Sequence, residues 1–218
     1  MVSFNKKEAK EPVMASRLIR YFLIVLSLVG LWHSAIAGKF YAKAWLAEQF
    51  IEHAWQASLE GESKVRPWPW ADTWPIAEIH VPRLNIRQII LSGDSSRVLA
   101  FGPGSTESGI LPGEPGLSIV SGHRDTSFNF LKNIQEGDKL IIKNEQEVTT
   151  YKVEELAIVD QRYFQIDNKI MKEQHSSILL VTCYPFDALR AGGNKRFVVL
   201  ANKVDSKTDS KSKIEKKI

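Results

Sequence analysis

The sequence predicts a mainly β (all-β) domain that follows one membrane-spanning helix. Three observations point to this fold class. An apolar run without charges covers residues 21–37. A stiff segment, Pro67-Trp68-Pro69-Trp70, is expected to end the helical part of the chain. Beyond it, short runs rich in Val, Ile, Tyr and Thr alternate with Gly, Pro, Asn and Asp, a pattern typical of barrels and sandwiches.

The apolar run has the length of a membrane span. About 20 residues at ~1.5 Å each cross a hydrocarbon core of about 30 Å. Lys and Arg gather before the run, and the positive-inside rule then keeps this end in the cytoplasm. We therefore expect a cytoplasmic N-terminus over 1–20 and a transmembrane signal-anchor over 21–38. Two alternatives stay open: a signal peptide cut after Ala35-Ile36-Ala37, and a buried core helix.

Aromatic and aliphatic residues recur at helical spacing after this run. They are Phe40, Trp45, Phe50, Ile51 and Trp55. We expect a membrane-proximal amphipathic helix and linker over 39–66. The pattern allows three arrangements: the anchor helix continuing outward, a helix lying on the membrane, and a helix packed on the following domain.

The strand-like runs define a domain over residues 67–202. They cover 77–81, 86–91, 117–121, 139–143, 149–159, 177–182 and 196–202, and residues 127–134 have the pattern of a short helical turn. Residues 203–218 are rich in Lys and Ser and nearly without apolar side chains, so we expect a disordered tail.

Charge and cysteine content exclude several classes of protein. The net charge of the 218 residues is +4, and residues 1–20 and 201–218 each contribute an excess of three positive charges. The remaining body has no basic excess, so nucleic acid is not expected as a partner. A single cysteine excludes an internal disulfide, and no spacing of His and Cys suggests a metal site. Gly102-Pro103-Gly104 lacks the lysine of a phosphate-binding loop, and no cofactor is expected.

Cys183 is the candidate nucleophile. It directly follows the apolar run 178–182, where a buried strand is expected to meet a loop. A lone cysteine is most often a small buried hydrophobe. In an exported domain, however, a thiol without an internal partner risks oxidation between molecules, which favours a chemical use for it.

Two further residues complete the candidate site. His123 comes shortly after the apolar run 117–120, in the segment Ser121-Gly122-His123, and it is the candidate proton partner of the thiol. Arg196 begins the last strand-like run, and a hairpin would return it beside Cys183. Its fixed positive charge suits a developing oxyanion. Arg190, in the connecting loop, is the competing arginine.

Three motifs, taken together in their order along the chain, resemble the sortase family. The residues concerned are Leu180-Val181-Thr182-Cys183, Gly122-His123-Arg124-Asp125 and Arg196. Three further segments resemble the class GN sortases of Gram-negative bacteria: Trp68-Pro69-Trp70-Ala71-Asp72-Thr73-Trp74-Pro75, Leu99-Ala100-Phe101-Gly102-Pro103-Gly104 and Thr182-Cys183-Tyr184-Pro185-Phe186-Asp187. The resemblance covers roughly residues 40–202.

The resemblance implies a fold, a location and a reaction. Sortases have an eight-stranded β-barrel with short helices and are anchored in the membrane. Here that implies a single-pass protein of the bacterial inner (plasma) membrane, with the catalytic domain on the periplasmic or extracytoplasmic side. Sortases cut an LPxTG-like sorting signal near the C-terminus of a secreted protein and join the new carboxyl end to an amine.

By the same resemblance, each site residue receives a role. Cys183 attacks the scissile carbonyl and forms a thioacyl-enzyme, while His123 protonates the leaving amine and deprotonates the incoming one. Arg196 holds the substrate and stabilises the oxyanion, and Thr182 supports the oxyanion or substrate through its hydroxyl or backbone. Two rival functions remain: a thiol hydrolase that releases its client protein, and a non-catalytic, membrane-tethered barrel that binds a secreted partner.

Overall fold

The computed structural model describes residues 13–106, 109–163, 176–188 and 193–204. The chain divides into two compact units, residues 1–46 and 47–218. Helix α1 (Val13–Leu59) begins in the first unit and ends in the second.

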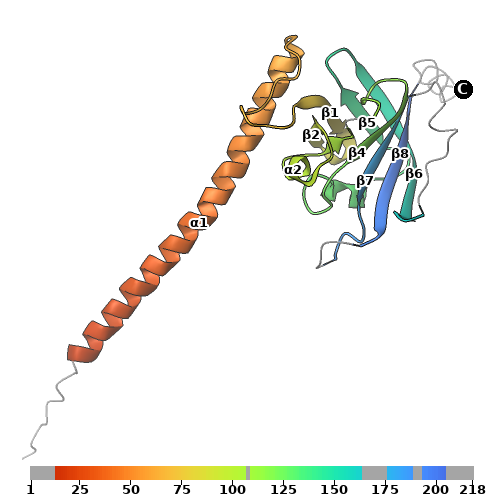
Figure 1. The fold of residues 1–218 in the computed structure, drawn as a ribbon. Coiled ribbons are helices and arrows are strands. Elements are labelled where there is room, and N and C mark those ends of the chain that lie inside the picture. The colour runs from red at the N-terminus through yellow and green to blue at the C-terminus, as the bar shows by residue number, and fades with distance from the viewer. Residues whose placement is uncertain (1–12, 107–108, 164–175, 189–192, 205–218) are drawn as a thin grey trace, which may run out of the picture. The chain divides into compact units, whose positions relative to one another are not determined.

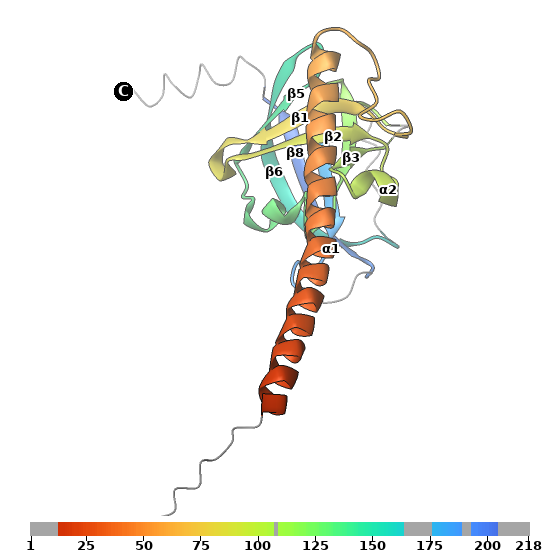
Figure 2. The same cartoon turned by 90° about the vertical axis from the view of Figure 1, so that its left-hand side faces the viewer.

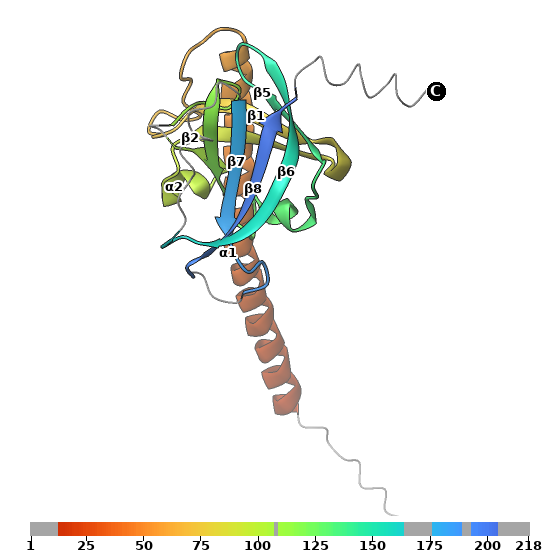
Figure 3. The ribbon, with the colours of Figure 1, turned by 90° about the vertical axis from the view of Figure 1, so that its right-hand side faces the viewer.

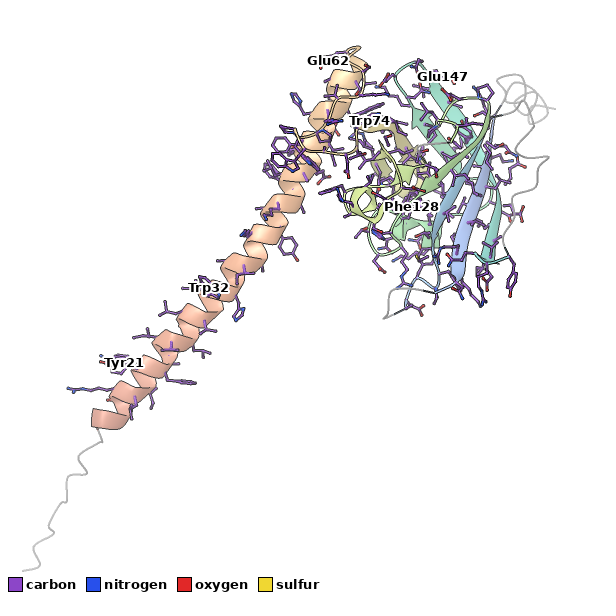
Figure 4. The ribbon with its side chains drawn as sticks, viewed as in Figure 1. Tyr21, Trp32, Glu62, Trp74, Phe128 and Glu147 are labelled. Atoms are coloured by element: carbon purple, nitrogen blue, oxygen red, sulfur yellow. The ribbon has the colours of Figure 1, made fainter. Side chains whose placement is uncertain are left out.

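In the first unit, α1 carries the apolar run, and its side chains are exposed. Tyr21 and Trp32 project from the helix in Figure 4. Among the described residues, α1 is the one helix that is long enough and apolar enough to cross a membrane, judged by length and composition. The predicted N-terminal helix is therefore present.

The last turns of α1 pack within the second unit. Ile51 and Trp55 are buried, and Trp55 Nε1 donates a hydrogen bond to Glu78 Oε2 at 3.2 Å. Arg87 pairs with both Glu52 and Glu78, and its guanidinium lowers the pKa of the Glu52 carboxyl. Two of the three arrangements that the helical pattern allowed are combined here: α1 continues without a break from the apolar run, and its last turns pack on the following domain.

The end of α1 differs from the expected one. The helix stops at Leu59, and Gly61 follows with a φ of +102°, a left-handed conformation that glycine adopts without strain. The proline-tryptophan segment that was expected to end the helix comes later. The second unit begins at Ala47 and so includes the last turns of α1.

Eight strands close into a barrel in the order β1-β2-β3-β4-β7-β8-β6-β5, with β5 paired to β1 (Figure 1, Figure 2). Their bounds are β1 (Pro75–Val81), β2 (Ile86–Ser92), β3 (Gly104–Ser105), β4 (Gly116–Ser121), β5 (Lys139–Lys143), β6 (Val148–Asp160), β7 (Ser176–Cys183) and β8 (Lys195–Lys203). The pairs β2–β3 and β4–β7 are parallel, and the remaining pairs are antiparallel. The predicted fold class, an eight-stranded barrel with short helices, is confirmed.

The short helices are η1 (Pro82–Leu84), α2 (Ser96–Leu99) and η2 (Asn129–Asn133). The last of these confirms the helical turn expected over 127–134. Strand β3 has two residues, and the sequence did not predict it. From residue 205 on, the expected disordered tail lies outside the described residues.

Alternation along β7 determines which side chains enter the barrel. Ile178, Leu180 and Thr182 are buried, and their partners across the register with β8 are Ala201, Val199 and Phe197. The interior also holds Phe128, which lies within the barrel in Figure 4. Successive side chains of a strand point to opposite faces, so Cys183 belongs to the outer face.

Candidate active site

Cys183 and Arg196 are direct neighbours across two strands. Cys183 is the last residue of β7, and its partner in the antiparallel register with β8 is Arg196. Figure 3 shows the two strands side by side. Opposite residues of an antiparallel pair share a face, with Cβ atoms about 4.5–5.5 Å apart. Both residues are half-buried, so the nucleophile candidate and the arginine share one face and remain partly accessible to solvent.

The Arg196 guanidinium is held by backbone carbonyls at the start of β8. Its Nη1 donates to the carbonyl oxygens of Gly193 at 2.6 Å and Lys195 at 2.9 Å. Within the described ranges, the hydrogen bonds of this guanidinium are made by Nη1, and a guanidinium has further donors on its other nitrogens. The competing Arg190 lies outside the described residues.

His123 lies at the same end of the barrel, brought there by parallel pairing. Strands β4 and β7 run parallel with Ser121 opposite Val181, and the Gly122 amide extends this pairing by donating to the Val181 carbonyl at 3.1 Å. His123 is therefore two residues past the last pair on β4, as Cys183 is on β7. The carboxyl ends of parallel strands meet at one edge, which unites these residues from distant parts of the chain.

A turn fixes the backbone of His123 and leaves its imidazole exposed. The His123 carbonyl accepts hydrogen bonds from the amides of Thr126 at 3.3 Å and Phe128 at 2.9 Å. In the described part of the chain, the hydrogen bonds do not include one between the imidazole and the thiol. The structure thus places His123 at the same edge as Cys183 without a direct bond between them.

Thr182 and Gly122 join the two strand ends. Thr182 is buried, and its hydroxyl donates to the Gly122 carbonyl at 2.7 Å. A side chain at position 122 would not fit, because a Cβ there would lie 2.6 Å from Cγ of the buried Phe128. The single hydroxyl proton of Thr182 is engaged inside the barrel, which favours support of the site through Gly122 over direct donation to an oxyanion.

Arg124 makes a contact that the sequence analysis did not anticipate. This arginine is buried, with 7% of its surface exposed. Its Nη1 donates to the Pro185 carbonyl and its Nη2 to the Ala188 carbonyl, both at 2.8 Å, and Nε lies 3.3 Å from Asp125 Oδ1. In the sequence, Arg124 stands out only because it directly follows His123. Its partners are some sixty residues away, and no local pattern reveals them.

The segment after Cys183 is ordered by backbone and aromatic contacts. The Tyr184 amide donates to the Lys195 carbonyl at 3.1 Å, and a cis peptide bond joins Tyr184 to Pro185. The Phe186 ring meets the rings of Tyr184 and Phe197 edge to face, with centroids 6.2 and 5.4 Å apart. These contacts hold the segment against the start of β8.

The outer face of the sheet carries an apolar strip that belongs to the same face as Cys183 and Arg196. It comprises the buried residues Leu117, Leu179 and Val198 and the half-buried Ile119, Ala157, Val159, Val181 and Leu200. The described residues contain no group of three or more His, Cys, Asp or Glu side chains that could hold an ion.

A comparison with known families decides the affiliation of the chain. The family model described as the sortase domain matches residues 79–204, more than half of the chain. The chain belongs to the sortase family. Sortases are cysteine transpeptidases, and Cys183 is the single cysteine in this sequence.

Among characterised relatives, this sortase is similar to sortase D of Bacillus subtilis. The two are 30% identical over 128 residues, which are 58% of this chain and 62% of the relative. The match thus spans less than two thirds of the relative's length.

Solved structures of other sortases share the fold. A Clostridium perfringens sortase D5 transpeptidase has a TM-score of 0.54 and 19% identity, covering 73% of this chain and 99% of its own. Sortase A from Corynebacterium diphtheriae has a TM-score of 0.54 and 23% identity, and the match covers 73% of this chain and 84% of that sortase. Sortase C from Clostridium perfringens, solved with a C-terminal cell wall sorting motif, has a TM-score of 0.53 and 21% identity. This match covers 83% of this chain and 99% of that sortase.

Proposed function

We propose that this protein is a membrane-anchored sortase that cuts an LPxTG-like signal near the C-terminus of a secreted protein and transfers the protein to an amine. The observation that carries the proposal is the direct pairing of Cys183 with Arg196, at the edge of the barrel where His123 also lies. A thiol, a fixed cation and an imidazole are the groups that acyl transfer through a thioester requires.

In the first half of the reaction, the Cys183 thiolate attacks the scissile carbonyl carbon. The electron pair of the carbonyl moves to its oxygen, and the Arg196 guanidinium stabilises the resulting oxyanion. The tetrahedral intermediate collapses with cleavage of the C–N bond, and His123 gives a proton to the leaving amine. The product is a thioacyl-enzyme.

In the second half, His123 takes a proton from the incoming amine as that amine attacks the thioester. Collapse of the second intermediate breaks the C–S bond and returns the Cys183 thiolate. Thr182 acts as a support in both halves, because its bond to Gly122 fixes the backbone directly before His123.

The apolar strip supports a peptide donor that carries aliphatic side chains. It lies on the same face as Cys183, and Val181 and Val198 are the strip members nearest to the nucleophile along β7 and β8. Leu and Pro of an LPxTG-like signal bury apolar area there, at about 25 cal/mol per Å². Segment 184–188, which follows Cys183, then borders the residues around the cut.

The location and the subgroup are parts of the same proposal. Residues 21–38 anchor the protein in the bacterial inner membrane in a single pass, with 1–20 in the cytoplasm. Residues 39–66 lead to a catalytic barrel over 67–202, on the periplasmic side, and 203–218 form a Lys-rich tail. The assignment to class GN is supported by the motifs at 68–75, 99–104 and 182–187.

The test uses the full chain in detergent micelles. A chain that starts at Glu62 would lack Ile51 and Trp55, which are buried in the second unit, and loss of a buried Trp generally costs about 3–5 kcal/mol. The protein is incubated with an LPxTG-type peptide and hydroxylamine, and the products are read by mass spectrometry. A hydroxamate at the cut is expected, because hydroxylamine resolves the thioester.

Three variants define the chemistry. Cys183→Ala removes the hydroxamate, and His123→Ala reduces it strongly, while His53→Ala, an exposed histidine on α1, retains it. If the free acid is the sole product in excess hydroxylamine, the protein is a hydrolase and not a transferase. The protein is a binding module if it binds a client protein but forms no Cys183-dependent product, either from the peptide or from the client's own C-terminal sequence.

A further inference from the structure

Arg124 is a buried charge beside the active site that the reaction does not use directly. Arginine is almost never fully buried unless its donors are satisfied. Here two carbonyl oxygens, of Pro185 and Ala188, accept from its two terminal nitrogens. Such charge-assisted bonds are stronger than neutral ones, so the contact is a firm link between two segments.

The link joins the histidine turn to the segment that follows the nucleophile. Two other links cross this edge, from the Gly122 amide to Val181 and from the Thr182 hydroxyl to Gly122, and both act at strand ends. In the part of the chain that the structure describes, the hydrogen bonds between residues 123–128 and residues 184–188 are those of Arg124. In the described residues, the direct hydrogen-bonded link between that segment and the histidine turn is therefore made by one side chain, while the Tyr184 amide and the Phe186 ring hold the segment against the start of β8.

We propose that Arg124 is a positioning and specificity-determining residue: it locks segment 184–188 to the histidine turn and so fixes the wall that the donor residue after the cut must pass. This rests on the proposed transpeptidase function. The role needs a planar fork, because two carbonyls that belong to different residues must be reached together. A lysine keeps the charge but offers a single point of donation.

The consequence for the reaction is a separation of effects. The barrel core beneath Cys183 does not depend on Arg124, since Leu180 and Val199 are packed within it. Loss of Arg124 therefore releases segment 184–188 from the histidine turn and leaves the thiol in place. We expect a fall in kcat, because the imidazole and the donor are no longer aligned, and a relaxed choice of the residue after the cut.

The experiment compares Arg124→Met and Arg124→Lys with a matched control, Arg97→Met. Arg97 is an exposed arginine that pairs with Asp72. The full chain is assayed in detergent with donor peptides carrying Gly or Ala after the cut, at saturating hydroxylamine. Hydrogen exchange of the peptide covering Tyr184 to Ala188 and alkylation of Cys183 by iodoacetamide are measured on the same samples.

For Arg124→Met we expect kcat to fall at least tenfold, the Gly-to-Ala preference to shrink, and exchange in 184–188 to quicken, with the alkylation rate within about twofold of wild type. Arg124→Lys recovers part of kcat, and Arg97→Met changes none of these. Equal kcat and equal preference in Arg124→Met and Arg97→Met overturn the proposal. So does an activity loss that merely follows a fall in Tm.

Failure of the proposed function gives a different result. If wild type forms no acyl product with any donor, the transpeptidase is refuted, and the exchange comparison still decides whether Arg124 locks the segment. If Arg124→Met does not fold, Arg124→Lys serves the same comparison. Unchanged exchange in 184–188 in that variant then overturns the lock.

Discussion

Thr182 gives the sharpest test of how the barrel supports its site. Its hydroxyl donates to the Gly122 carbonyl at 2.7 Å, and 2% of the residue is exposed. Thr182→Val keeps the shape of the side chain and removes the donor, which leaves a buried carbonyl without this bond. The cost is about 1–3 kcal/mol, and a chain of this size then loses about 2–12 °C in Tm.

Activity is expected to fall further than stability suggests. Gly122 precedes His123, so a shift of this backbone moves the imidazole, and kcat falls by about ten- to a hundredfold. Thr182→Ser is the matched control, because it keeps the hydroxyl and loses one methyl group, at about 0.8 kcal/mol. We expect a small drop in Tm and nearly full hydroxylaminolysis for the serine variant.

A second measurement separates support of the backbone from direct donation to the oxyanion. The Gly122 amide donates to the Val181 carbonyl, and its hydrogen exchange reports whether the strand ends stay joined without substrate. Exchange is expected to quicken in Thr182→Val and to match wild type in Thr182→Ser. Full kcat in the valine variant, or equal losses of kcat in both variants, would refute this reasoning.

Two further perturbations test the geometry around the site and the electrostatics of the barrel. Gly122→Ala places a Cβ 2.6 Å from Cγ of the fully buried Phe128, so we expect about 1–3 kcal/mol of destabilisation and a lower hydroxamate yield; an unchanged Tm contradicts the clash. Arg83 lowers the pKa of Asp138, so this carboxylate stabilises the fold above its ordinary pKa of about 4 and loses that effect as the pH falls through the lowered value. Asp138→Asn is expected to lower Tm by a few degrees at pH 7 and to approach wild type in thermal scans as the pH falls below the lowered pKa; a gap that is constant with pH rules out the ion pair as the cause.

Local pattern was enough to predict most of the barrel. Seven strands were expected from runs of β-branched residues bounded by turn residues, because each strand has its own alternation or apolar run. Strand β3 was missed, since two residues, Gly104 and Ser105, have no period to detect. The placement of Trp55 was left open because an amphipathic helix has the same spacing whether it faces lipid or a barrel.

The candidate site was predictable in its residues and not in its supports. Cys183 is the last residue of β7, His123 lies two residues past the end of β4, and Arg196 is the second residue of β8, so each has an apolar run beside it as a local signal. The contacts of Arg124 and Thr182 join residues some sixty positions apart. Such contacts depend on the register between β4 and β7, which a single sequence does not state.

The placement of the nucleophile at a strand end reconciles two demands on it. Leu180 and Thr182 before it are buried, while Pro185 after it is exposed, so Cys183 lies where the rigid core gives way to solvent. A thiol deeper in the barrel would lose access to a peptide and pay for desolvation of its reactive thiolate. A thiol further into the loop would lose its fixed position beside Arg196. The strand end keeps the thiolate hydrated and its neighbours in register, and the links from Thr182 and Arg124 bring the histidine turn into the same frame.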